Sequence, residues 1–84
     1  MNNQELDDLI VAFFEVEQAI LQLSFILSLI QAEIVRLTAE GNNEEEINNL
    51  IQDSFVITQV ILQLTSILLL IQEEIFKVST EIAA

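Results

Sequence analysis

The chain has 84 residues, 52% of them hydrophobic, and its 14 acidic against 2 basic residues give a formal net charge of −12. Nucleic acids and anionic lipid headgroups are bound mainly through Lys and Arg, so this charge excludes a nucleic-acid partner. Cysteine and histidine are absent, so no disulfide can form, and we expect neither a metal site nor a cofactor.

The first ten residues, MNNQELDDLI, contain no basic segment and no small-residue cleavage site. A secretory signal peptide has both features. We therefore expect no targeting signal, and we expect a soluble protein that stays in the cytoplasm if it is made in a cell.

A first helix is predicted from about residue 3 to residue 40. Apolar residues recur in it with alternating steps of three and four, which is the a/d pattern of a coiled coil or bundle. This first seam consists of Leu6, Leu9, Phe13, Val16, Ile20, Leu23, Leu27, Ile30, Ile34 and Leu37.

A short loop, about residues 41–43, is predicted to follow. Gly41 is the only glycine and suits the left-handed position after a helix. Asn43, followed three residues later by Glu46, resembles a capping box that begins a second helix. So short a linker makes the two helices antiparallel neighbours.

The second helix is predicted from about residue 44 to residue 82, and it repeats the seam of the first. Its members are Ile47, Leu50, Ser54, Ile57, Ile61, Leu64, Leu68, Ile71, Ile75, Val78 and Ile82. The sequence therefore predicts one all-α domain over residues 1–84, an antiparallel helical hairpin with coiled-coil heptads.

The two helices are copies of one unit. When residues 17–40 are aligned with residues 58–81, thirteen of the twenty-four positions are identical, so the copies are predicted to share the same surfaces. Two surfaces stand out beside the a/d seam. Position b forms an apolar stripe: Phe14, Leu21, Val35, Phe55, Leu62, Leu69 and Phe76. Apart from Glu17, position e forms a polar seam without charge: Ser24, Gln31, Thr38, Thr58, Thr65, Gln72 and Ser79.

The apolar stripe predicts self-assembly. A hairpin can cover the a/d seam and little more, so the seven stripe side chains would each forgo roughly 1.5–3 kcal/mol of burial in a monomer. That loss is comparable with the whole stability of a small domain. We expect further copies of the chain to cover the stripe, in a multi-helix bundle or barrel.

The polar seam has two interpretations. Its Ser, Thr and Gln side chains either lie at a bundle edge in contact with water, or lie inside the assembly. In the interior they would form a hydrogen-bond network between helices or line a central channel. Interior amides at Gln31 and Gln72 would then need partners, because an unpaired buried amide costs about 1–3 kcal/mol.

The duplicated hairpin, with unbroken heptads and neutral polar residues at one heptad position, resembles de novo designed helical bundles. The closest resemblance is to designed hairpins that assemble into concentric rings, barrels or pores. This resemblance covers the whole chain but is architectural, without a diagnostic motif. It implies a cyclic homo-oligomer, between tetramer and octamer, whose task is to assemble or to enclose a pore.

Two other function classes remain open. Residues 54–72 and 18–32 carry no charge, so the hairpin could instead insert into a membrane as a pore or channel, although no Trp, Tyr or basic flanks mark the span. The apolar stripe could also receive an amphipathic helix from another protein. An enzyme is not expected, because no nucleophile motif, phosphate loop or histidine is present.

Overall fold

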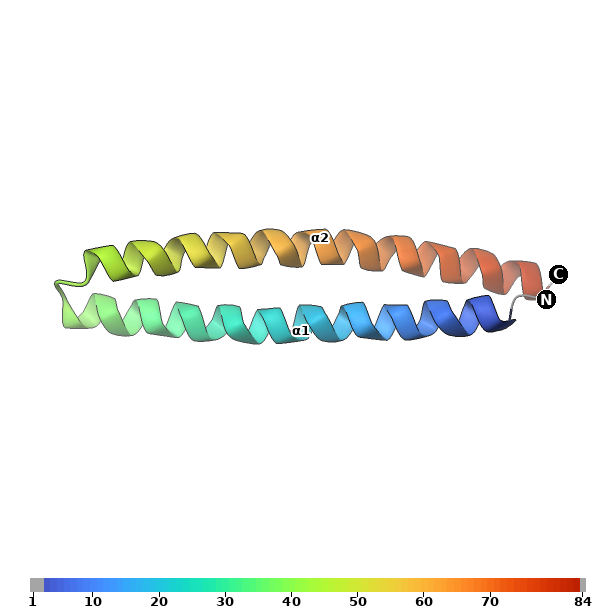
Figure 1. Ribbon diagram of the computed structural model, residues 1–84, viewed down its shortest axis with the longest axis horizontal. Coiled ribbons are helices and arrows are strands. Elements are labelled where there is room, and N and C mark those ends of the chain that lie inside the picture. The colour runs from blue at the N-terminus through green and yellow to red at the C-terminus, as the bar shows by residue number, and fades with distance from the viewer. Residues whose placement is uncertain (1–2, 84) are drawn as a thin grey trace.

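The computed structural model describes residues 3–83 and consists of two long helices, α1 (Asn3–Glu40) and α2 (Glu44–Ala83). The helices are antiparallel and pack against each other along their length, with both chain ends at the same end of the rod (Figure 1). The molecule measures 64 × 14 × 13 Å. The predicted all-α helical hairpin is confirmed.

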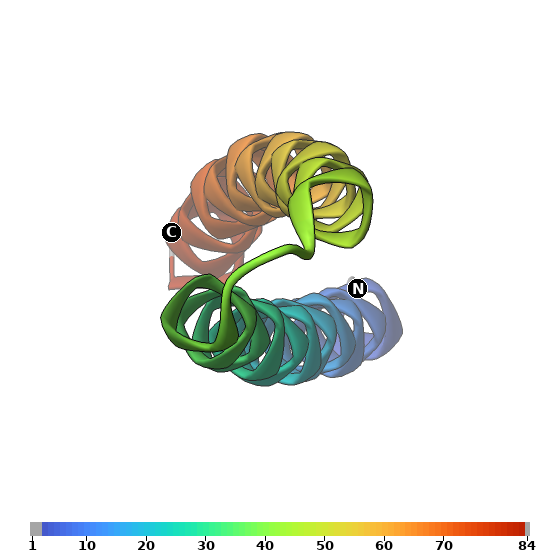
Figure 2. The ribbon, with the colours of Figure 1, turned by 90° about the vertical axis from the view of Figure 1, so that its left-hand side faces the viewer.

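Seen from the loop end, the helices are not strictly parallel. Each helix runs obliquely to the axis of the rod. The two helices therefore exchange sides between the loop end and the opposite end of the rod (Figure 2). Such a crossing keeps a three-four spaced apolar seam in contact with the partner helix over many turns.

The loop reverses the chain through two successive left-handed residues, Gly41 (φ 80°) and Asn42 (φ 59°). Glycine adopts this conformation without steric cost, and asparagine tolerates it better than most residues. The Gly41 amide donates to the Leu37 carbonyl oxygen at 3.1 Å, which closes the end of α1. The left-handed role predicted for Gly41 is therefore confirmed.

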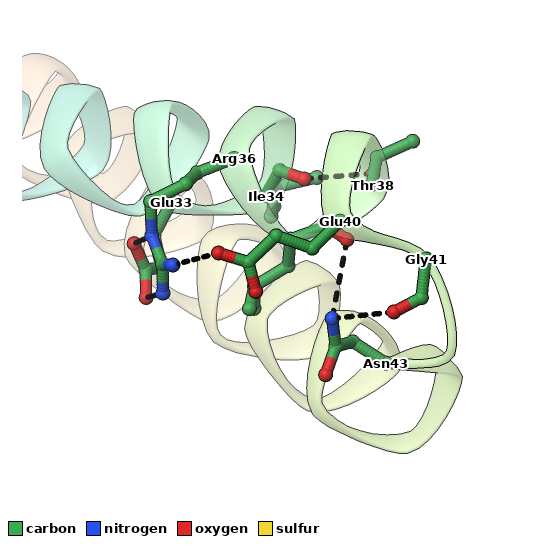
Figure 3. Close-up of polar contacts among 8 residues, drawn as sticks. Glu33, Ile34, Arg36, Thr38, Glu40, Gly41 and Asn43 are labelled. Carbon is green, nitrogen blue, oxygen red and sulfur yellow. Dashed lines mark hydrogen bonds and ion pairs between the residues drawn. The ribbon is translucent and has the colours of Figure 1, made fainter.

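Asn43 caps the loop differently from the prediction. Its carbonyl accepts the first α2 hydrogen bond, from the Ile47 amide at 2.9 Å. Its side-chain Nδ2, however, donates back across the loop to the carbonyl oxygens of Leu37 at 3.3 Å and Gly41 at 2.8 Å (Figure 3). The bonds of this side chain thus tie α2 to the end of α1 instead of reaching Glu46 in a capping box.

The a/d seam faces the partner helix. Every seam residue is buried or half-buried, whereas most residues outside the seam are exposed. The one polar member, Ser54, is half-buried and donates its hydroxyl to the Ile51 carbonyl oxygen at 2.7 Å, so its donor is paired. Within residues 3–83, only Leu37 and Val78 are buried. The hairpin alone therefore covers one side of each helix.

Candidate functional site

The apolar stripe lies on the outside of the hairpin. All seven of its side chains are exposed, from 55% for Leu69 to 75% for Phe76. The internal repeat places four of them on α2 at heptad spacing and three on α1. No contact within the described hairpin covers them, so they form the first part of the candidate site.

The stripe is only part of a larger apolar surface. Ten further large hydrophobic side chains are exposed: Ile10, Val11, Phe25, Ile26, Leu29, Ile51, Val56, Val60, Ile67 and Leu70. They occupy several heptad positions, so a search along one heptad position does not find them. For all but Ile10, Val11 and Ile51, the signal that points to them is the high apolar content of the uncharged central segments.

The polar seam is divided between two environments. Ser24 and Ser79 are half-buried at the margin of the helix-helix contact, whereas the other five members, Gln31, Thr38, Thr58, Thr65 and Gln72, are exposed. The structure therefore leaves the two glutamine amides on the outer surface. Within residues 3–83, no side-chain hydrogen bond joins α1 to α2, so the hairpin itself contains no network across the seam.

The threonine hydroxyl groups of the polar seam are satisfied within their own helices. Thr38 donates to the Ile34 carbonyl oxygen at 2.7 Å, and Thr58 and Thr65 donate to the carbonyls four residues earlier at 2.8 Å. The same pattern occurs at Ser28, Ser66 and Thr80. Because a hydroxyl bonded in this way keeps its donor paired without water, it can be covered by apolar atoms at reduced cost.

The outer side of α1 is hollowed. A shallow hollow of about 450 Å³ is lined by Val11, Phe14, Glu15, Gln18, Ala19 and Gln22. A second hollow, of about 500 Å³, is lined by Leu21, Gln22, Phe25 and Ile26. Both are open to solvent and mainly apolar. Together they form what we call the outer groove of α1.

The basic residue near the loop is engaged in ion pairs. Arg36 donates from Nε and Nη2 to the two carboxylate oxygens of Glu33, at 2.7 and 2.6 Å, and from Nη1 to Glu40 (Figure 3). The hydrogen bonds from Arg36 hold the pKa of Glu33 below its ordinary value, and the two carboxylates raise the pKa of Arg36. All three side chains are solvent-exposed, so the cluster contributes little to stability.

The charged residues flank an uncharged centre. The uncharged segment of α1, residues 18–32, is about 22 Å long, and that of α2, residues 54–72, is about 28 Å long. Both helices are long and apolar enough to cross a membrane by length and composition. None of the apolar window in either helix is buried by the hairpin.

Within the described residues, no cluster of acidic side chains is arranged to hold a metal ion. Comparisons of this chain with protein-family models, with curated proteins and with solved structures gave no match. The function must therefore be argued from the surfaces of the hairpin.

Proposed function

We propose that this chain is a structural protein that self-assembles into a homo-oligomeric helical bundle or barrel. The observation that carries the proposal is the imbalance of burial. Two side chains of the described chain are buried, whereas seventeen large hydrophobic side chains are exposed. Few soluble monomers leave so much contiguous apolar surface in water.

The energetic scale favours association. The stripe side chains are each more than half exposed, so covering them contributes on the order of 10 kcal/mol per chain. Association costs about 4–15 kcal/mol in lost freedom of motion, and it costs more where side chains become ordered. The ten other exposed hydrophobic side chains add to the favourable side, which makes an assembly with several contacts per chain the stable state.

The polar seam supports an interior role in such an assembly. Its threonine hydroxyls already have partners within the helix, so they can be covered without loss. Gln31 and Gln72 have no side-chain partner within residues 3–83 and can pair with a neighbouring hairpin or with water in a central channel. Such paired amides would select the number of copies, because a wrong number leaves them unpaired.

Light scattering coupled to size exclusion, in detergent-free buffer, tests the proposal. We expect one species with a mass several times the 9.5 kDa of the chain. Substituting Leu62→Glu together with Leu69→Glu should dissociate it, because each copy would bury two charges. The matched control, Asn49→Glu with Gln63→Glu, adds the same charge outside the stripe and should remain assembled. A monomeric parent chain would overturn the proposal. It would instead favour an interaction module that binds an amphipathic helix of another protein.

Membrane insertion is the second candidate, and a specific observation favours it. Both helices are long and apolar enough for a membrane span, and no residue of either apolar window is fully buried by the hairpin. The two uncharged segments are nevertheless shorter than the roughly 30 Å of a bilayer core. Flotation with neutral liposomes separates the candidates: a membrane hairpin floats with the vesicles and gives ion currents in planar bilayers, whereas a soluble assembly remains at the bottom of the gradient.

A further inference from the structure

We propose that the b-position row of α2, namely Phe55, Leu62, Leu69 and Phe76, docks into the outer groove of α1 of a second copy. This inference rests on the proposed self-assembly and specifies which surfaces meet. The occupant of the groove is thus another molecule of the same chain, bound through its α2 and not through its α1.

The groove has the spacing of a heptad. The four residues that line the second hollow, Leu21, Gln22, Phe25 and Ile26, each follow by seven residues one that lines the first, namely Phe14, Glu15, Gln18 and Ala19. The hollows therefore repeat about every 10.5 Å along α1. The α2 row repeats at the same interval, and its side chains are 55–75% exposed. This is the match of knobs to holes that packs one helix on another.

The α2 row and the hollows of α1 also lie at matching heights along the rod. In copies standing side by side at the same level, residues equidistant from Asn42 along the two helices lie at about the same height, because both helices rise about 1.5 Å per residue. Leu62 is then level with Gln22, which lines both hollows. Leu69 is level with Glu15, which lines the first. Two successive members of the row thus meet two successive hollows without any vertical shift.

Opposite charges of the two copies would meet at the end of the α2 row. Lys77 follows Phe76 directly, and the structure gives it no ion pair within residues 3–83. By the same height rule it lies level with Asp7 and within one residue of Asp8 in the second copy. Lys77 and Asp8 share one heptad position, so they fall on the same rim of the contact. Opposite charges there favour this alignment over one shifted along the groove.

The repeat itself indicates why α1 offers the groove and α2 the row. The two copies keep Phe14/Phe55 and Leu21/Leu62 but diverge on either side of them: Val11 and Phe25 of α1 correspond to Gln52 and Ser66 of α2. Two large apolar side chains of the groove are thus replaced by polar ones on α2. Contact between unlike surfaces is head-to-tail, which closes into a ring when the rotation permits.

The proposed docking also determines the direction in which the polar seam of α2 faces. On a helical wheel, position e lies about 40° from a and about 60° from b, between the two contacts that α2 would make. Because the two contacts of α2 lie on either side of position e, successive hairpins would curve toward that side. Thr58, Thr65 and Gln72 therefore face the inside of the curve. A closed ring would present these neutral polar groups to its central space.

Cysteine cross-linking tests the contact, since the unmodified chain has no cysteine. Two single variants, Gln22→Cys and Leu62→Cys, are unfolded in denaturant, refolded separately or as an equal mixture, and oxidised. We expect the mixture to yield at least five-fold more disulfide dimer than either variant alone. As much dimer from one variant alone as from the mixture would show that like surfaces meet and would overturn the proposal.

Failure of the docking and failure of self-assembly can be told apart. Oligomers by light scattering without a disulfide in the mixture would overturn the docking and leave self-assembly standing, whereas monomers would overturn both. A second pair of variants tests the alignment. Lys77→Glu should weaken association about two- to five-fold per contact, and adding Asp8→Lys should restore it. Loss without rescue would contradict the proposed alignment.

Discussion

Leu37 and Val78 occupy equivalent positions of the internal repeat, and they are the two buried residues of the described chain, with 3% and 2% of their surface exposed. The antiparallel hairpin places Leu37 near the loop and Val78 near the chain ends. One residue of the helix-helix contact is therefore fully covered near each end of the rod, whereas the other seam residues are half covered.

Truncating Leu37 should weaken the hairpin. Leu37→Ala removes a buried side chain and leaves a cavity, so we expect the free energy of unfolding to fall by about 2–4 kcal/mol. Gln59→Ala is the control, because Gln59 is exposed and lies outside the apolar surface, and should cost less than about 1 kcal/mol. Urea denaturation followed by circular dichroism measures both. Equal losses would contradict the packing of Leu37 against α2.

A substitution at Gly41 should destabilise the loop through backbone strain alone. A Cβ added at Gly41 would meet no atom within 4 Å, but φ is +80°. Gly41→Ala should therefore lower the free energy of unfolding by about 1 kcal/mol, and Gly41→Asn by less, since asparagine tolerates the left-handed region. Thermal unfolding of the three chains ranks them. An alanine variant as stable as the parent would mean that the loop adopts another conformation.

The ion pair between Glu33 and Arg36 should be visible in a pH titration. The hydrogen bonds from Arg36 lower the pKa of Glu33 in the folded chain. The pair thus stabilises the folded chain above the unfolded-state pKa of Glu33, and this stabilisation is lost as the pH falls through the lowered folded-state pKa. Because Glu33 is exposed, the effect on stability is small.

Carboxyl NMR shifts provide the measurement. Arg36→Gln should return the pKa of Glu33 to its ordinary value, whereas Lys77→Gln, which removes the distant basic residue, should leave it unchanged. If the pKa of Glu33 stayed low without Arg36, its cause would lie elsewhere.

The two glutamines of the polar seam should control the number of copies. Replacing both Gln31 and Gln72 by Leu should broaden the distribution of oligomers in native mass spectrometry, because an apolar contact specifies register less than a paired amide. The control, Gln59→Leu with Gln63→Leu, makes the same chemical change away from the seam. An unchanged and uniform oligomer in the seam variant would show that the seam does not select stoichiometry.

Salt should strengthen assembly. Each copy carries a net charge of −12, concentrated toward the two ends of the rod, so association brings like charges together. Raising NaCl from about 50 to 500 mM shortens the screening length from about 14 to about 4 Å, and we expect the apparent dissociation constant to fall at least about ten-fold. Sedimentation equilibrium measures it.

A charge-removal variant separates screening from other effects of salt. Glu45→Gln with Glu46→Gln removes two charges at one end of the rod and should reproduce part of the salt effect at 50 mM NaCl. Dissociation on adding salt would instead indicate that ion pairs hold the copies together.

The arrangement of the helices could be predicted from the sequence because two simple signals agree. The three-four spacing of apolar residues, from Leu6 to Leu37 and again from Ile47 to Ile82, defines one face on each helix, and every residue of both faces is buried or half-buried. Gly41 supplies the left-handed residue that ends α1. Periodicity and backbone preference are local properties, so the sequence reports them directly.

The candidate site was only partly predictable, for a physical reason. The stripe follows one heptad position, so it can be read from the sequence, but the outer groove of α1 is walled by residues from four positions, such as Val11, Phe14, Gln22 and Ile26. Its existence depends on the sizes of neighbouring side chains. The partners of Asn43 were likewise inaccessible, because they depend on how the loop brings Leu37 and Gly41 together.

The duplication within an antiparallel hairpin has a consequence for orientation. Two helices that share much of their sequence and run in opposite directions are related by an approximate two-fold axis across the rod, so a hairpin turned upside down presents a similar outline. A neighbouring molecule can distinguish top from bottom only where the copies differ, as at Val11/Gln52 and Phe25/Ser66. Such exchanges decide whether all molecules in an assembly point the same way.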